Sequence, residues 1–138
     1  MIKNIKGFTM VELMVVMTIM MVLTAIGVVS YQQASIKSRD SRRAADLEKI
    51  RIALELYRQE VGGTYPANST VMTSLLVPKY IQMMPSDPKA DRNYQFINLL
   101  NGYGYALLAG MESLGSTTTT DVTQNCGALT CNYEVKNP

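Results

Sequence analysis

The sequence GFTMVELMVVMTIMMVLTAIGVV, residues 7 to 29, decides the organisation of this chain of 138 residues. The 17 residues from Leu13 to Val29 have no charged side chain, and Glu12 is the one charge between Phe8 and Val29. A helix over that longer stretch would be about 33 Å long, roughly the thickness of the hydrocarbon layer of a bilayer. The stretch therefore predicts a transmembrane helix over residues 8–30.

The charges that flank the stretch predict its orientation. Lys3 and Lys6 precede it, and basic residues beside a membrane segment stay mostly in the cytoplasm. The N-terminus is therefore expected in the cytoplasm and the chain after Tyr31 outside. The alternative is a cleaved secretory signal peptide, but the apolar stretch is longer than is usual there, and Ser-Tyr-Gln-Gln follows Val29 instead of a small-x-small cleavage site.

Glu12 is the residue that needs a special explanation. A carboxylate in a membrane segment costs roughly 2.5 to 3.5 kcal/mol near the centre, so such residues usually have a partner or a function. No Lys or Arg occurs between Lys6 and Lys37. If the chain were cut after Gly7, the new α-amino group of Phe8 could pair with Glu12 of a neighbouring copy. The alternative is an ordinary membrane anchor with one acidic residue near its edge.

The stretch KGFTMVELMVVMTIMMVL, residues 6 to 23, resembles the class III signal of type IV pilins and of the related pseudopilins. That signal consists of a short basic leader, a glycine, Phe-Thr-x-x-Glu and an apolar helix. The resemblance implies that prepilin peptidase removes the leader, residues 1–7, by cutting after Gly7. It also implies that Phe8 becomes the N-methylated first residue and that Glu12 sets the register of subunits in a filament.

An amphipathic pattern continues beyond the apolar stretch. Apolar residues recur every three or four positions on one helix face, at Leu47, Ile50, Leu54, Tyr57 and Val61. The pattern predicts one helix from about Phe8 to Val61, with residues 31–62 as its amphipathic half and Gly62-Gly63 as its end. The segment AADLEKIRIALELYRQEVGGTYP is similar to the amphipathic half of the pilin helix, especially in pseudopilin-like members, and this resemblance favours a pseudopilin.

The basic residues Arg39, Arg42 and Arg43 lie at the start of that amphipathic half. We expect them to form a solvated helix face that is balanced by its own acidic neighbours. Contact with lipid phosphates is the alternative.

Residues 63–138 are expected to form a loop and a small antiparallel sheet. Strands are predicted over residues 94–98, 103–109 and 130–136, with a hairpin turn at Asn101-Gly102 and a Ser- and Thr-rich loop over 114–123. Tyrosines 94, 103, 105 and 133 are expected to pack on a sheet face. The predicted fold class is α+β: a long N-terminal helix packed against a small antiparallel sheet, as in the type IV pilin fold that the resemblance implies.

Cys126 and Cys131 are the two cysteines of the chain. On the external side of a membrane an oxidised pair is favoured over metal ligation by two thiols. A disulfide that closes so short a loop stabilises by about 2 kcal/mol in the chain-entropy model. A disulfide commonly ties the C-terminal region of pilins, so the resemblance implies the same pairing.

The resemblance predicts a structural subunit of a type IV pilus or pilin-like filament. A pseudopilin of type II secretion is the alternative, but the acidic residues after Gly110, which are Glu112, Asp121 and Glu134, are too sparse for the calcium-binding loop usual in major pseudopilins. The implied partners are further copies of the chain, prepilin peptidase, the inner-membrane assembly machinery and, before assembly, the lipid bilayer. The implied location is the inner membrane and then a cell-surface filament.

Composition argues against several other functions. The chain has no histidine, the commonest general base and zinc ligand. Apart from Lys3 and Lys6 the charges balance, which disfavours nucleic-acid binding. The chain shows no nucleophile with a base and no glycine-rich phosphate loop, so a membrane-anchored enzyme or receptor is the less favoured class, and no catalytic residue, metal or cofactor is predicted.

Overall fold

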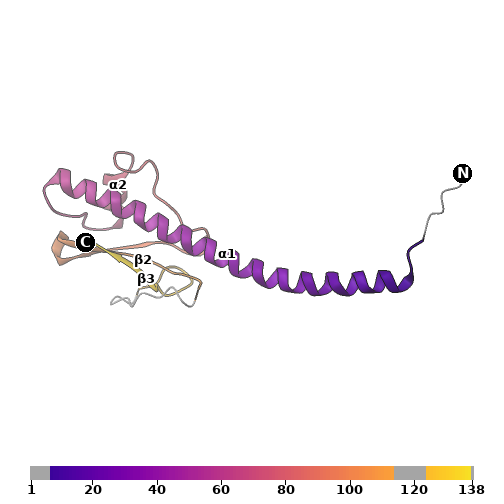
Figure 1. Ribbon diagram of the computed structural model, residues 1–138. Coiled ribbons are helices and arrows are strands. Elements are labelled where there is room, and N and C mark those ends of the chain that lie inside the picture. Colours follow the sequence, from indigo (N-terminus) through magenta and orange to yellow (C-terminus); the bar gives the residue numbers. More distant parts are fainter. Residues whose placement is uncertain (1–6, 114–123, 138) are drawn as a thin grey trace, which may run out of the picture. The chain divides into compact units, whose positions relative to one another are not determined.

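The structure, a computed structural model, describes residues 7–113 and 124–137 (Figure 1). The chain divides into two compact units, one up to Ser35 and one from Ile36 onward, which we call the head. The elements in chain order are α1 (Met10–Val61), α2 (Ser69–Leu76), β1 (Gln95–Leu99), the 3-10 turn η1 (Leu100–Gly102), β2 (Gly104–Ala109) and β3 (Tyr133–Lys136). Most of the predicted leader, residues 1–6, and the predicted loop 114–123 lie outside the described residues.

Helix α1 ends where the double glycine predicts. Gly62 has a φ of 91° and Gly63 a φ of 113°, a backbone region that residues with a Cβ rarely adopt. The N–H groups of both glycines donate to the carbonyl of Arg58 at 3.2 and 3.0 Å. These bonds satisfy a carbonyl that the end of a helix would otherwise leave without a partner.

The unit up to Ser35 consists mainly of the first half of α1, and its apolar side chains are exposed. An 18-residue window of α1 has a mean hydropathy of 2.5, so by length and composition this helix could cross a membrane. The hydroxyls of Thr18 and Thr24 donate to the carbonyls of Val15 and Met20 at 2.8 and 2.7 Å. These threonines therefore add no unsatisfied hydroxyl to the apolar surface.

The head has its core between the second half of α1 and the sheet. Leu47, Ile50 and Leu54 are buried against Phe96 and Leu107, as the helical pattern predicts. Val61, the last apolar residue of that pattern, is 53% exposed, because it is the last residue of α1 and the chain turns at the next position.

The sheet has the order β1-β2-β3, and both pairs of strands are antiparallel. Its central strand β2 is buried on both faces: Tyr105 and Leu107 face the helix core, and Ala106 and Leu108 pack against the cysteines. Figure 1 shows β2 and β3 beside the second half of α1. The predicted α+β class, with a long helix on a small antiparallel sheet, is confirmed.

Two local predictions about the sheet were wrong. Tyr103 is 65% exposed instead of packed on a sheet face, because it lies in the hairpin turn and β2 begins one residue later. The third strand begins at Tyr133, three residues after the predicted start, because Cys131 is still part of the disulfide loop. The other predicted sheet-face tyrosines, 94, 105 and 133, contact the core.

Helix α2 lies in a region that was predicted to be loop. The Asn68 side chain caps the helix, because its Oδ1 accepts the Val71 N–H at 2.9 Å. Met72 and Leu76 from α2 are buried in the same core as α1. The helix has only 8 residues, so its apolar periodicity is too short to identify it in the sequence.

Arg43 corrects the prediction of a solvated arginine face. Its side chain is 0% exposed, and its guanidinium donates to Asp87 at 2.7 and 2.9 Å and to Asp40 and Glu112 at 2.8 Å each. Three carboxylates thus surround one buried cation, which compensates its loss of hydration. Of the predicted basic cluster, only Arg42 is mostly exposed.

Glu112 joins several cations of the head in one cluster. Arg39 donates to both of its carboxylate oxygens, at 2.8 and 2.7 Å, and Lys89 lies 2.9 Å from it. The hydrogen bonds from Arg39, with further contributions from Lys89 and Arg43, hold the pKa of Glu112 well below its usual value although burial acts in the opposite direction. The cluster ties α1 to the segment that follows β2.

Candidate functional site

The predicted processing residues lie just before α1. Gly7, Phe8 and Thr9 have no helical structure, and α1 begins at Met10. Phe8 is 76% exposed, and a Cβ placed on Gly7 would meet no atom within 4 Å. The peptide bond between Gly7 and Phe8 therefore lies outside the helix.

Thr9 and Glu12 cap the start of α1. The Glu12 N–H donates to Thr9 Oγ1 at 3.2 Å, and the Thr9 N–H donates to Glu12 Oε2 at 3.5 Å. This reciprocal pair is a capping box, which satisfies two of the N–H groups that a helix start leaves free. Glu12 thus has a role within its own chain, in addition to the role that was predicted between copies.

The capping box was missed in the sequence, although its Thr-x-x-Glu spacing is a known helix-start signal. It does not supply Glu12 with a counter-charge, because a backbone N–H is neutral. One carboxylate oxygen accepts the Thr9 N–H, and the other remains for a cation. The geometry is therefore compatible with both tasks at once.

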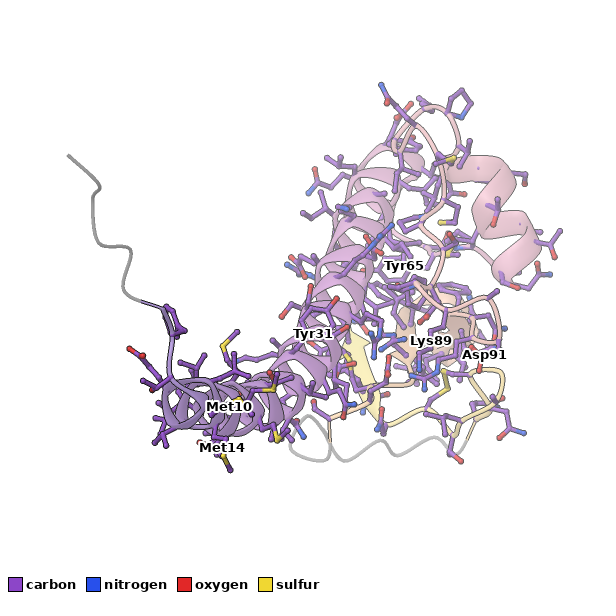
Figure 2. All side chains as sticks on the ribbon, turned by 90° about the vertical axis from the view of Figure 1, so that its right-hand side faces the viewer. Met10, Met14, Tyr31, Tyr65, Lys89 and Asp91 are labelled. Carbon is purple, nitrogen blue, oxygen red and sulfur yellow. A yellow bond between two sulfur atoms is a disulfide. The ribbon has the colours of Figure 1, made fainter. Side chains whose placement is uncertain are left out.

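The surface around this site is apolar and open. Figure 2 shows Met10 and Met14 with their side chains projecting away from the ribbon of α1. Further along, α1 forms the wall of a shallow hollow of about 520 Å³, lined by Val16, Met17, Met20, Met21, Thr24 and Ala25. Such a surface needs a covering of lipid or of other helices.

The two cysteines form a disulfide in the head. Cys126 and Cys131 are both buried and pack on Ala106 and Leu108 of β2. The disulfide loop thereby covers the face of the sheet that α1 does not cover.

The disulfide loop also supports a neighbouring turn. The Ala128 N–H donates to the Asp91 carbonyl at 3.0 Å, and Gly127 pairs with Arg92 in an isolated bridge. Gly127 has a φ of 87°, and a Cβ there would lie 2.2 Å from the Asp91 carbonyl oxygen. Only glycine fits this close approach, so the loop and the turn at Asp91 form one rigid feature.

Among residues 7–113 and 124–137, no group of three or more His, Cys, Asp or Glu side chains could hold a metal ion. The ionisable groups of the head are mostly paired with one another, as in the cluster around Arg43. The N-terminal segment, with Phe8 exposed and an apolar helix surface, suits recognition by another protein and packing against lipid or other helices.

Comparison with known proteins agrees with this geometry. Residues 2–28 match the model of the prokaryotic N-terminal methylation motif. Over 123 residues the chain is 31% identical to prepilin peptidase-dependent protein D of Escherichia coli (strain K12), an alignment that covers 88% of this chain and 82% of the relative. The chain belongs to the type IV pilin and pseudopilin family. No solved structure matches this pilin-family chain.

The matched motif contains all three residues of the predicted processing and assembly site, Gly7, Phe8 and Glu12. The apolar helix and the motif together indicate that this pilin-family chain is anchored in a membrane. The individual roles of the three residues are part of the proposed function.

Proposed function

We propose that this chain is the structural subunit of a type IV pilus or pilin-like filament. Prepilin peptidase would cut after Gly7, Phe8 would become the methylated N-terminus, and copies of α1 would pack together in the filament. The observation that carries the proposal is Glu12, a carboxylate in an exposed apolar unit whose partner among residues 7–113 and 124–137 is the backbone N–H of Thr9. The amine of Phe8 on a neighbouring copy would supply the missing positive charge.

The similar protein of Escherichia coli is named for its dependence on prepilin peptidase, which supports the same processing here. Before assembly the subunit would sit in the inner membrane with its N-terminus in the cytoplasm, because Lys3 and Lys6 precede the apolar stretch. After extraction by the assembly machinery it would belong to a filament at the cell surface. The function of the chain would be to form the polymer and not to catalyse a reaction.

The ion pairs of the head favour a pilus over a secretion pseudopilus. Glu112 already forms ion pairs with Arg39, Arg43 and Lys89, and Glu134 Oε2 lies 3.5 Å from Lys136 Nζ. These two carboxylates are therefore poor candidates for a calcium-binding loop, which needs several free oxygen ligands. Asp121, the third acidic residue considered there, lies outside the described residues.

The proposal is tested by shearing filaments from cells that express the chain and measuring the mass of the subunit. The expected mass is that of residues 8–138 with one added methyl group and one disulfide. A Gly7→Val variant is the matched control, because a bulky residue before the cut should leave the full-length precursor in the membrane. An unprocessed chain that never enters a filament would contradict the proposal.

A further inference from the structure

A charged groove in the head lies between α1 and the loop of residues 80–86. It has a volume of about 590 Å³. The α1 side contributes Arg42, Asp46 and Lys49, and the loop side contributes Tyr80 and Met83 among others. Met83 is 79% exposed, so the groove has an apolar rim as well as charged groups.

The groove has more positively charged than negatively charged side chains. The side chains of Arg42 and Lys49 are 67% and 63% exposed, and both approach the buried carboxylate of Asp46, at 3.9 and 3.0 Å. The Tyr94 hydroxyl also donates to Asp46, at 3.2 Å. Two cations therefore share one carboxylate, which leaves a net positive charge that a second carboxylate can neutralise.

An acidic side chain without a partner occurs elsewhere in the same head. Within the described residues, the Asp91 carboxylate takes part in no ion pair or hydrogen bond, whereas every other acidic residue of the head does. Asp91 is exposed, and its backbone carbonyl accepts the Ala128 N–H and lies close to Gly127 of the disulfide loop. Figure 2 shows Asp91 at the outer edge of the head in that view. The fold thus presents a lone carboxylate on a rigid support.

The acidic turn and the basic groove are complementary in charge, yet they do not meet within one chain. We propose that Asp91 of one subunit docks into the groove formed by Arg42 and Lys49 of the next subunit. This contact joins two different surfaces, so it can repeat from one subunit to the next, and it gives an open helix where the rotation between subunits does not close a ring. It rests on the proposed filament function and adds to it a contact between heads, which sets the relative rotation of neighbouring subunits.

Complementary charges at such a contact act mainly on specificity, because like charges that face each other are strongly unfavourable. Asp91→Lys and Lys49→Glu should therefore each lower the yield of sheared fibres about tenfold relative to membrane abundance. The double variant Asp91→Lys with Lys49→Glu exchanges the two charges and should restore most of the yield. Lys79→Glu is the matched control, because Lys79 does not line the groove. The variant loses an exposed ion pair with Glu60, which contributes less than about 1 kcal/mol, and it should assemble normally.

A cross-link tests proximity independently of yield. Chains with Asp91→Cys and chains with Lys49→Cys, expressed together, should give disulfide-linked dimers in sheared fibres, whereas Asp91→Cys with Lys79→Cys should not. Normal fibres without this dimer, or a charge exchange that fails to restore assembly, would overturn the docking contact and leave the filament function standing. If the parent chain forms no fibres at all, the filament function itself fails and the contact with it.

Discussion

Apolar side chains such as Met14 and Val22 are 67% and 60% exposed in the unit up to Ser35, whereas in the head the cation Arg43 is completely buried. This distribution is the reverse of what water favours. The head pairs the buried guanidinium of Arg43 internally, with three carboxylates around it. The first unit exposes its apolar surface, and its one carboxylate, Glu12, accepts the backbone N–H of Thr9.

This difference between the two units predicts that the stability of the single chain and its assembly depend on different residues. Substitutions in the head should change the free energy of unfolding of the single chain. Substitutions around Glu12 should change that free energy by at most about 1 kcal/mol and should act mainly when copies come together. The predictions below test this separation in order of decreasing effect on stability.

Arg43→Ala should have the largest effect, a loss of about 3–5 kcal/mol, because it leaves Asp40, Asp87 and Glu112 together without their shared cation. Urea unfolding of the full chain in detergent, followed by tyrosine fluorescence, measures it. Arg42→Ala is the matched control: that side chain is 67% exposed, so its removal should cost less than about 1 kcal/mol. Equal losses for the two variants would show that burial of Arg43 does not matter.

Glu112→Gln should cost about 2 kcal/mol at neutral pH, because charge-assisted hydrogen bonds to Arg39 are lost. The folded-state pKa of Glu112 lies below its ordinary value of 4.5, so its contribution is present above pH 4.5 and is lost as the pH falls below that value. The variant should therefore lose less stability than the parent between pH 4.5 and more acidic conditions. Parallel acid profiles for the two proteins would contradict this assignment.

Replacing both Cys126 and Cys131 by Ser should destabilise the head by about 2 kcal/mol, as expected for closing a short loop. It should also loosen the Asp91 turn, which the disulfide loop supports through Ala128. Amide hydrogen exchange of Ala128 in the parent and the variant measures the second effect. Unchanged protection would show that the turn is rigid without the disulfide.

Thr9→Ala should have the smallest effect, about 1 kcal/mol on the first turn of α1, because it removes one side of the capping box. Amide exchange at Glu12 in detergent reports the loss, since that N–H donates to Thr9. Thr18→Ala is the control, because the Thr18 hydroxyl donates to a carbonyl inside the helix and caps no N–H. A fully protected Glu12 amide in Thr9→Ala would exclude the cap.

The parts of this fold that could be predicted depend on local sequence. The apolar stretch, the helical spacing up to Val61 and the glycine pair are contiguous signals, and they locate α1 almost to the residue. The Asn101-Gly102 pair likewise locates the hairpin between β1 and β2.

The parts that could not be predicted depend on distant partners. Arg43 pairs with Asp87 and Glu112, which are 44 and 69 residues away along the chain. A single sequence gives no sign of that pairing. Three nearby basic residues therefore suggested a solvated face. The capping role of Thr9 could have been predicted from its spacing to Glu12, because Thr-x-x-Glu is a local helix-start signal.

In the proposed function Glu12 serves assembly through its charge, by pairing with the amine of Phe8 on a neighbouring subunit. Glu12→Gln tests it most directly, because glutamine keeps the capping box and the size of the side chain but removes the charge. We expect normal membrane abundance and normal processing at Gly7, with a fibre yield at least about tenfold lower, since an amine buried without its counter-ion is costly. Normal fibre yield from Glu12→Gln would contradict the account, and so would a loss of membrane insertion, because removing a charge favours partitioning into lipid.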